Sequence, residues 1–263
     1  MANAARAWGW TLGLVVCALV AGCGPSQPPG PYIPPVAPLR VGVSQGSAPL
    51  VFLQEGRVVG LEADFAQRFA DELGRPLRFV ALEWSRLIPA LLNGKIDVIM
   101  SGMTATESRL VRVAFSDPYL DSGLMALIRR GDARKLSSAQ AIIENLPQIG
   151  VKEGTTSEAF VRGRFQWNEI SLYPTSTAAV TELLQRRIDV FVSDAPIILW
   201  QASAHDGELT PIRKVLKREQ LAWAFRRDDG ALIANANAML ARMQADGQLA
   251  SMVRHWMPYW PGL

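Results

Sequence analysis

The sequence predicts an α/β fold made of two lobes of similar build. From Leu39 onward, apolar-alternating segments typical of strands take turns with segments of helical spacing, a pattern that indicates parallel sheets covered by helices. An eleven-residue pattern, L-L-x-x-[K/R]-I-D-V-x-x-S, occurs at 91–101 and again at 183–193. Each copy reads as a helix end, a turn and a buried strand, so we expect one copy in each lobe. The alternative is convergence on a common helix-turn-strand pattern.

Residues 1–22 have the features of a signal peptide. Arg6 precedes an apolar run, residues 8–21, that is too short to span a bilayer comfortably. The run closes in LVAGC, which resembles the bacterial lipobox and makes Cys23 the candidate for lipidation. The alternative is an ordinary secretory signal with an incidental cysteine. Cys17 is the only other cysteine, so we expect no internal disulfide in the mature chain.

The segment 23–38 is predicted to be a linker that starts at the lipidated cysteine. Proline occupies 7 of the 15 positions from 24 to 38, which favours an extended polyproline II spacer. The formal net charge is only +3 and the basic residues are scattered, so nothing favours nucleic-acid binding. No later apolar stretch is long enough to cross a membrane.

The folded part can be read element by element. Apolar residues four apart, such as Leu61, Phe65 and Phe69, mark the face of a helix that Gly74 would end. The elements expected in the first half are a strand at 39–44, a helix at 60–74, a strand at 76–84, a helix at 85–94 and a strand at 95–101. Those expected in the second half are a strand at 149–154, helices at 155–165 and 175–187, and a strand at 188–194.

Polar residues follow the strand of the first copy. Thr104 and Glu107 fit a capping box, so we expect a helix to begin there. Arg109 lies about one turn further on, where its guanidinium could pair with a ligand carboxylate through two parallel hydrogen bonds. The alternative for Arg109 is a solvated place on the helix face.

The second copy is followed by Asp194, which could hold a ligand ammonium. Its alternative role is the N-cap of a helix that Pro196 would start. Thr155 and Glu158 fit another capping box, after the strand at 149–154. The free backbone amides of such a helix start attract anions, although it could be an ordinary helix start.

These residues together suit a zwitterion. Ligands of parallel sheets bind beyond the carboxyl ends of the strands, so both copies should face one shared site. We expect Arg109 and the amides near Thr155 and Thr156 to take a carboxylate, and Asp194 an ammonium. Trp84 could stack on the ligand's side chain, or be a core or surface aromatic.

The stretch GKIDVIMSGMTATESRLVRVAFSDPYLDSG at 94–123 resembles the family-3 bacterial solute-binding proteins, the polar-amino-acid receptors of ABC importers. VVGLEADFAQRFADELG, VKEGTTSEAF, RRIDVFVSDAP and ADGQLASMVRHW are similar to the same family. The resemblance implies a type II periplasmic-binding-protein fold with two hinged lobes, each holding a mainly parallel sheet flanked by helices. Residues 39–126 plus 221–263 would form lobe 1, and residues 127–220 lobe 2.

The resemblance also implies roles for residues. Arg109 would clamp the α-carboxylate, helped by Thr104 and Thr156. Asp194 and the Gly102 carbonyl would hold the α-ammonium, and Trp84 would pack on the side chain.

The sequence departs from the family pattern at the positions that are expected to contact the ligand's side chain. Ser47 and Leu50 stand where family members usually carry aromatics, and Ser44 stands where some receptors for cationic amino acids carry an acid. The sequence therefore favours an amino-acid-like ligand, but favours less strongly one of the amino acids that family members usually bind.

The resulting expectation is a non-enzymatic, monomeric lipoprotein of the periplasm or cell envelope that delivers its ligand to an ABC permease in the inner membrane. Neither a metal nor a cofactor is expected, since His205 and His255 are 50 positions apart. One alternative is an enzyme similar to the periplasmic cyclohexadienyl or arogenate dehydratases. It would use Glu62 or Glu153, which we expect to be solvated or cap-related. The other alternative is a ligand-sensing receptor on the same fold.

Overall fold

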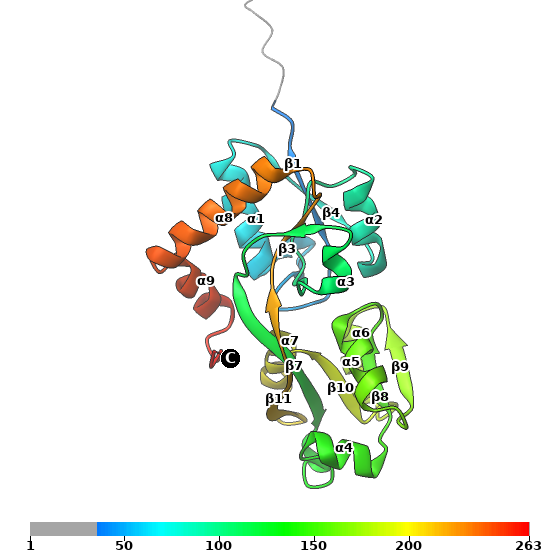
Figure 1. The fold of residues 1–263 in the computed structure, drawn as a ribbon. Helices are drawn as coiled ribbons and strands as arrows, with labels where there is room; N and C mark the ends of the chain where they lie inside the picture. The colour runs from blue at the N-terminus through cyan, green and yellow to red at the C-terminus, as the bar shows by residue number, and fades with distance from the viewer. Residues whose placement is uncertain (1–35, 263) are drawn as a thin grey trace, which may run out of the picture. The chain divides into compact units, whose positions relative to one another are not determined.

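The computed structural model describes residues 36–262, which form two lobes, each around a five-stranded sheet (Figure 1). The predicted signal peptide, Cys23 and the linker up to residue 35 lie outside the described residues. The α/β fold class with two lobes is confirmed. None of the described helices is long and apolar enough to cross a membrane.

The first lobe is built on the sheet β4-β1-β5-β12-β6. Its strands are β1 (Leu39–Val43), β4 (Leu77–Ala81), β5 (Val98–Ile99), β6 (Ala114–Phe115) and β12 (Ala224–Phe225). A separate hairpin joins β2 (Phe52–Gln54) to β3 (Arg57–Val59). The helices of this lobe are α1 (Leu61–Glu72), the 3-10 turn η1 (Trp84–Arg86), α2 (Leu87–Leu92), α3 (Glu107–Leu110), α8 (Gly230–Ala245) and α9 (Gln248–Trp256).

The second lobe is built on the sheet β11-β7-β10-β8-β9. Its strands are β7 (Leu120–Arg129), β8 (Ile149–Lys152), β9 (Ile170–Tyr173), β10 (Val190–Asp194) and β11 (Leu209–Leu221). Its helices are the 3-10 turn η2 (Arg130–Asp132), α4 (Ala139–Asn145), α5 (Thr156–Arg164), α6 (Ser176–Leu184) and α7 (Ala195–Ala204). Helices α5 and α6 pack on β8 and β10, while α7 packs on β7 and β11.

Both sheets are mixed, which corrects the prediction of mainly parallel sheets. In each, the strands that carry the repeated pattern pair in parallel with a neighbour, as β5 does with β1 and β10 with β8. The antiparallel strands are those next to the lobe crossings: β6 and β12 in the first lobe, β7 and β11 in the second. A chain that enters and leaves a lobe at one edge of its sheet places neighbouring strands there in opposite directions.

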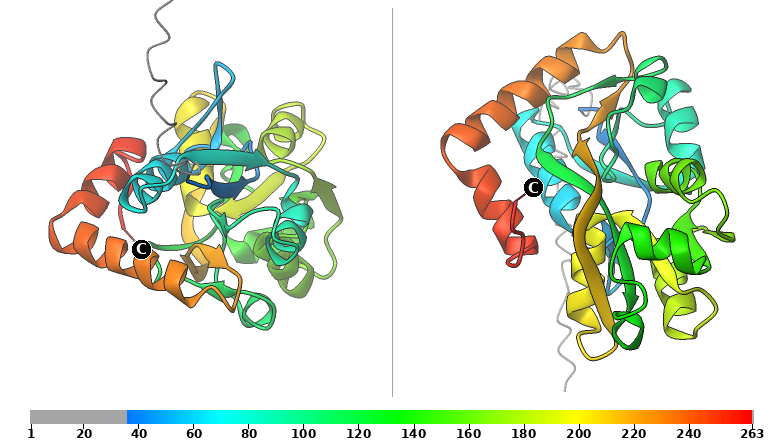
Figure 2. Two further views of the ribbon diagram at one scale, coloured as in Figure 1. Left: turned by 90° about the horizontal axis from the view of Figure 1, so that it is seen from above. Right: turned by 60° about the horizontal axis from the view of Figure 1, so that its bottom comes forward.

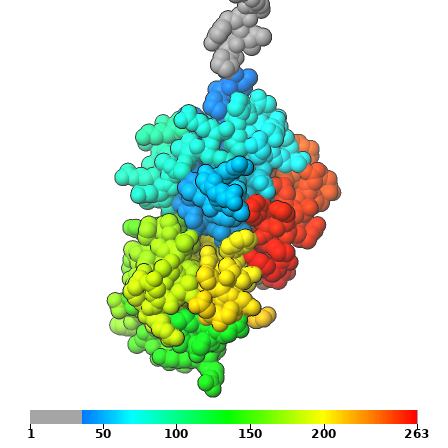
Figure 3. Space-filling model, turned by 180° about the vertical axis from the view of Figure 1, so that it is seen from behind, coloured from blue at the N-terminus to red at the C-terminus, as the bar shows by residue number. Residues whose placement is uncertain are grey.

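The long antiparallel pair β7 and β11 joins the lobes and is seen running between them in Figures 1 and 2. It pairs Leu120 with Leu221 at one end and Arg129 with Leu209 at the other. Residues 120–126, expected in the first lobe, therefore belong to the second sheet. Seen from behind, the lobes meet where the hairpin of β2 and β3 (blue) lies next to α7 (yellow), and Phe52 contacts Trp200 there at 5.9 Å between ring centroids (Figure 3).

The repeated pattern adopts the same local structure twice. Its turn residue is Gly94 in the first copy and Arg186 in the second, and both are left-handed, with φ of 65° and 61°. Asp97 of the first copy accepts a hydrogen bond from the backbone N–H of Arg40 in the neighbouring β1. Asp189 of the second copy accepts one from the N–H of Gln148, next to β8. The aspartate of the pattern thus fixes its strand against the adjacent strand in both lobes.

Candidate functional site

A small cavity between the lobes contains all nine of the predicted ligand-binding residues. Its volume is about 20 Å³, close to the room that one water molecule needs, so the lobes are closed on each other. The predicted residues in its lining are Ser47, Leu50, Trp84, Gly102, Thr104, Arg109, Thr155, Thr156 and Asp194. The other lining residues are Ser101, Lys152, Ser176, Ser193 and Ile197.

The ends of β5, β8 and β10 deliver most of these residues, as the rule for parallel strands predicts. Ser101 and Gly102 follow β5, and Ser193 and Asp194 end β10. Gly102 has φ of 66°, and a Cβ at this position would lie 2.6 Å from the Leu50 side chain. The close approach of Leu50 and the left-handed backbone both explain why glycine is found there.

Arg109 reaches the cavity from the short helix α3. Its Nη1 atom donates to the backbone oxygen of Thr104 at 2.9 Å, and its carbon Cζ lies 5.3 Å from the centre of the Trp84 ring. No carboxylate of the described chain lies within ion-pair distance of the guanidinium. Burial lowers the pKa of Arg109, while Asp194 and Glu219 act in the opposite direction.

The helix start before Arg109 differs from the prediction. Thr106, not Thr104, is the N-cap of α3, and its Oγ1 atom accepts a hydrogen bond from the backbone N–H of Arg109. The predicted capping box of Thr104 and Glu107 is therefore wrong. Thr104 cannot cap because its backbone bridges to Leu221 and its hydroxyl donates elsewhere. Capping patterns do not distinguish two threonines two residues apart, since either can precede a helix.

Asp194 faces the cavity from the opposite lobe. It stands at the N-cap position of α7, but its side chain makes no capping hydrogen bond, so that alternative is excluded for the carboxylate. Its Oδ1 atom is shielded from solvent and has no hydrogen-bond partner within the described chain. The pKa of Asp194 is raised to about 7, mainly by burial and also by the nearby Glu219 carboxylate, against the opposing effects of Arg109 and Lys152.

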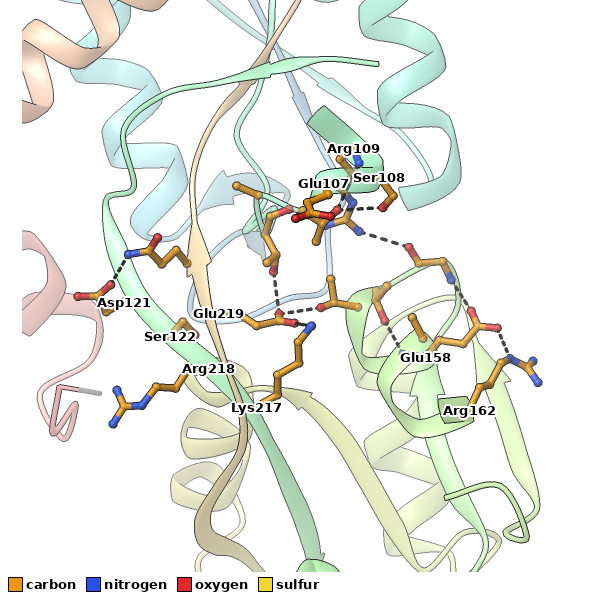
Figure 4. Close-up of a pocket in the computed structure, with 18 residues that line it drawn as sticks. Glu107, Ser108, Arg109, Asp121, Ser122, Glu158, Arg162, Lys217, Arg218 and Glu219 are labelled. Carbon is orange, nitrogen blue, oxygen red and sulfur yellow. Dashed lines mark hydrogen bonds and ion pairs between the residues drawn. The ribbon is translucent and has the colours of Figure 1, made fainter. Parts of the chain in front are cut away.

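Thr104 and Thr156 both donate to one carboxylate, that of Glu219 on β11. The distances from their Oγ1 atoms to Glu219 Oε2 are 2.9 and 2.8 Å, and Lys217 Nζ donates to Oε1 at 2.9 Å. Figure 4 shows Glu219 and Lys217 reaching into the groove of about 1160 Å³ that adjoins the cavity. Glu219 therefore links the two lobes, and it accepts the hydrogen bonds of the two threonine hydroxyls that we expected to donate to a ligand.

The helix start at α5 was predicted correctly. Thr155 is its N-cap, and the Oγ1 atom accepts from the backbone N–H of Glu158 at 3.4 Å. Glu158 in turn accepts from the N–H of Gly154. The Gly154 carbonyl, just before the helix, accepts a hydrogen bond from Trp84 Nε1 at 2.8 Å, so this aromatic ring links the two lobes.

Lys152 is a cavity residue that sequence reasoning missed. It ends β8 and is 4% exposed; its Nζ atom donates to Ser44 Oγ at 3.1 Å and lies 4.9 Å from the centre of the Trp84 ring. Burial lowers its pKa to about 8, against the opposing effect of Asp194. The sequence did contain a signal for this residue, because Lys152 ends a predicted buried strand whose end was expected to face the site.

The two carboxylates considered for catalysis differ in their surroundings. Glu153 is exposed, as expected, but Glu62 is fully buried, which corrects the expectation for it. The Oε1 atom of Glu62 accepts from the Gly102 backbone N–H at 2.6 Å and from the Tyr119 hydroxyl. Burial raises the pKa of Glu62 to about 7, and these hydrogen bonds oppose the rise. In the described residues, no cluster of His, Cys, Asp and Glu is placed to hold a metal ion.

Known proteins of several kinds are similar to this chain. The profile of the bacterial extracellular solute-binding proteins, family 3, matches residues 39–259. The L-cystine-binding protein TcyJ of Escherichia coli strain K12 is 26% identical over 83% of this chain and 82% of its own length. The cyclohexadienyl dehydratase of Pseudomonas aeruginosa is 25% identical over 85% of this chain and 84% of its own length.

Two solved structures have the same fold. The ancestral amino acid-binding protein AncCDT-1, a precursor of cyclohexadienyl dehydratase, has a TM-score of 0.79 and 31% identity, over 84% of this chain and 95% of that chain. An ancestral arginine-binding protein bound to arginine has a TM-score of 0.78 and 29% identity, over 84% of this chain and 98% of that chain.

Proposed function

We propose that this chain, which belongs to family 3 of the bacterial extracellular solute-binding proteins, captures an amino acid or an amino-acid-like molecule between its lobes. One observation carries the proposal: Arg109 and Asp194, of opposite charge and from opposite lobes, line one cavity, and neither has an ion-pair partner in the described chain. A ligand carboxylate on the guanidinium and a ligand ammonium on the carboxylate would satisfy both groups.

The other lining residues support this arrangement. Thr104, Thr156 and the amides at the start of α5 would complete the carboxylate site after the hydroxyls leave Glu219. The Gly102 carbonyl would share the ammonium with Asp194. Around the ligand's side chain we place Trp84, Ser47 and Leu50, with Thr155 at the edge of the site.

Closure of the lobes would couple binding to delivery. The cavity is enclosed between the two lobes, so an amino acid would enter while the lobes are apart, and the lobes would close around it with a wider spacing than in the ligand-free structure. Ligand contacts from both lobes would then favour closure, with residues 39–119 and 222–263 moving against residues 120–221. The closed form would dock on an ABC permease of the inner membrane.

The setting that we propose is the periplasm or cell envelope. The signal peptide at 1–22 would be removed and the chain, as a monomer, would be anchored through lipids on Cys23 with residues 24–38 as spacer. More than one acyl chain is needed for stable anchoring, which a diacylated or triacylated cysteine provides.

Isothermal titration of the protein from residue 39 with a panel of amino acids tests the proposal. A ligand that is recovered unchanged should bind the wild type, and Arg109→Ala should lose on the order of a hundredfold in affinity, because a buried carboxylate is left unpaired. Arg112→Ala is the matched control, since Arg112 is exposed and is not part of the cavity lining. Equal ligand affinity in the wild type and in Arg109→Ala contradicts the assignment.

A second candidate is a dehydratase acting on a cyclohexadienyl acid. It is favoured by the likeness to the Pseudomonas enzyme and by two buried carboxyls, Asp194 and Glu62, whose pKa values near 7 suit a general acid at neutral pH. Incubation with prephenate and with arogenate distinguishes the two functions. If the wild type forms the aromatic product and Glu62→Gln or Asp194→Asn does not, the protein is an enzyme. If both substrates are recovered unchanged, the receptor function is supported instead.

A further inference from the structure

A separate cavity, which we call the second-lobe cavity, lies among α4, α5 and β11. Its volume is about 310 Å³, at the small end of the range of about 300–1,000 Å³ that is typical of sites for small molecules. Figure 1 shows α4 at the end of the second lobe that points away from the first lobe. None of the residues that line this cavity lines the cavity between the lobes or its adjoining groove, so it is not part of the site described above.

The strand β11 leaves its regular pairing where it lines the second-lobe cavity. Ile212 pairs with Ala126 and Lys217 pairs with Leu124, so the four residues 213–216 stand opposite a single residue of β7. Such a bulge bends its strand and re-aims side chains, and bulges are over-represented next to functional sites. The side chains that line the cavity from this bulge are those of Lys214, Val215 and Leu216.

One wall of the cavity is apolar and continuous with the core of the second lobe. Phe160 and Leu216 are half-buried and pack against that core, and the ring of Phe160 lies 6.0 Å from the ring of Phe165 between centroids. Val215 is half-buried as well. Because these side chains are only partly covered by the protein, an apolar group placed against them would remove further apolar surface from water.

The cavity also carries two positive charges and no negative one. Arg164 and Lys214 line it and are exposed, and no acidic residue is part of the lining. Within the described residues, neither side chain forms an ion pair, since the ion pairs of the second lobe are made by other basic residues. Arg162, two positions before Arg164, shows the contrast, because it pairs with Glu158 at 2.9 Å.

We propose that the second-lobe cavity is a further ligand site, which binds a small amphipathic anion with an apolar body, such as one aromatic ring or a short acyl chain, and a carboxylate head. The head would accept two parallel hydrogen bonds from Arg164 and a third from Lys214. The body would pack on Phe160 and Leu216. This inference is independent of the proposed amino-acid capture, because the two sites share no residue.

Nuclear magnetic resonance of the ¹⁵N-labelled protein from residue 36, titrated with phenylacetate, tests the inference. The amide signals of residues 138–140, 160–164 and 213–216 should shift and saturate together, as binding at one site requires. Phenylacetamide has nearly the same shape without the charge, and it should bind at least tenfold more weakly, the difference expected for hydrogen bonds to a charged group.

A pair of double variants separates the site from the general charge of the surface. Arg164→Ala with Lys214→Ala should weaken phenylacetate binding at least tenfold, and both residues are exposed, so the fold should persist. Lys135→Ala with Arg213→Ala is the matched control, because it removes the same charge from exposed positions of the same lobe that do not line the cavity. The control should bind phenylacetate within twofold of the wild type.

Three outcomes would overturn the inference: no saturable shift of these amides, equal losses of affinity in the two double variants, or a loss in Arg109→Ala. The last would place the anion between the lobes, where Arg109 is the proposed carboxylate partner. Sedimentation with phosphatidylglycerol vesicles distinguishes a free ligand from a membrane surface. Vesicle binding that requires Arg164 and Lys214, in a protein that does not bind phenylacetate, also contradicts the proposal.

Discussion

Replacement of Asp194 by asparagine should stabilise the protein while it abolishes ligand binding. Asp194 is a carboxylate without a hydrogen bond at Oδ1, and burial raises its pKa from 3.8 to about 7. The folded state therefore binds more protons than the unfolded state between these pH values, and stability falls as pH rises from 3.8 to 7. At neutral pH this pKa shift corresponds to a loss of folding stability on the order of 4 kcal/mol.

Asparagine has nearly the shape of aspartate and no charge, so it removes this cost. Its buried amide needs partners of its own, which we expect to cost about 1–3 kcal/mol. The net gain should be about 1–3 kcal/mol at pH 8, and the melting temperature should rise by roughly 3–10 °C for a domain of this size.

Thermal unfolding of the ligand-free protein from pH 4 to pH 8 is the assay. The wild type should lose stability toward pH 7 through both Asp194 and Glu62, whose pKa is also raised to about 7. The variant should show a shallower decline because only Glu62 remains. An Asp194→Asn protein that melts at or below the wild-type temperature at pH 8, with an unchanged pH slope, would refute the reasoning.

Three further expectations follow from local structure. The stability of the ligand-free protein should rise between about pH 8 and pH 10.5, because burial lowers the pKa of Lys152 from 10.5 to about 8 and the unfolded state binds more protons in that range; thermal unfolding from pH 7.5 to pH 10 checks this. Arg186 and Gly94 both have a left-handed backbone, which glycine adopts more easily than other residues. In denaturant unfolding, Arg186→Gly should therefore stabilise the second lobe by about 0.5–1 kcal/mol, and Gly94→Ala should destabilise the first lobe by about 1 kcal/mol. A change in stability of the same sign for both variants would contradict the backbone explanation. Glu219→Gln should lower the melting temperature by several degrees, because a charged acceptor shared by both lobes becomes neutral.

The sequence predicted the position of the site better than the contacts in it. Strand ends are readable from apolar runs, so Asp194 and Gly102 could be assigned to one cleft before the structure was known. The hydrogen-bond partner of Thr104 and Thr156 could not be predicted from the sequence. Glu219 is 63 residues from Thr156 and lies in a strand whose charged residues are typical of a solvated surface.

Two features of the fold were missed for a similar reason. The antiparallel pairs arise from the strands that cross between lobes, and periodicity does not reveal strand direction. The early start of the second sheet at Leu120 follows from pairing with Leu221, about a hundred positions away along the chain. Local patterns determine elements, whereas these properties depend on distant partners.

The crossing by β7 and β11 has a consequence for the order in which the protein can form. The second lobe is one uninterrupted stretch, whereas the sheet of the first lobe has β12, from near the C-terminus, between β5 and β6. During synthesis or export, residues 120–221 can complete their sheet while the first lobe still lacks an inner strand. We therefore expect the second lobe to fold early and autonomously, and the first lobe to close only when residues 222–262 arrive.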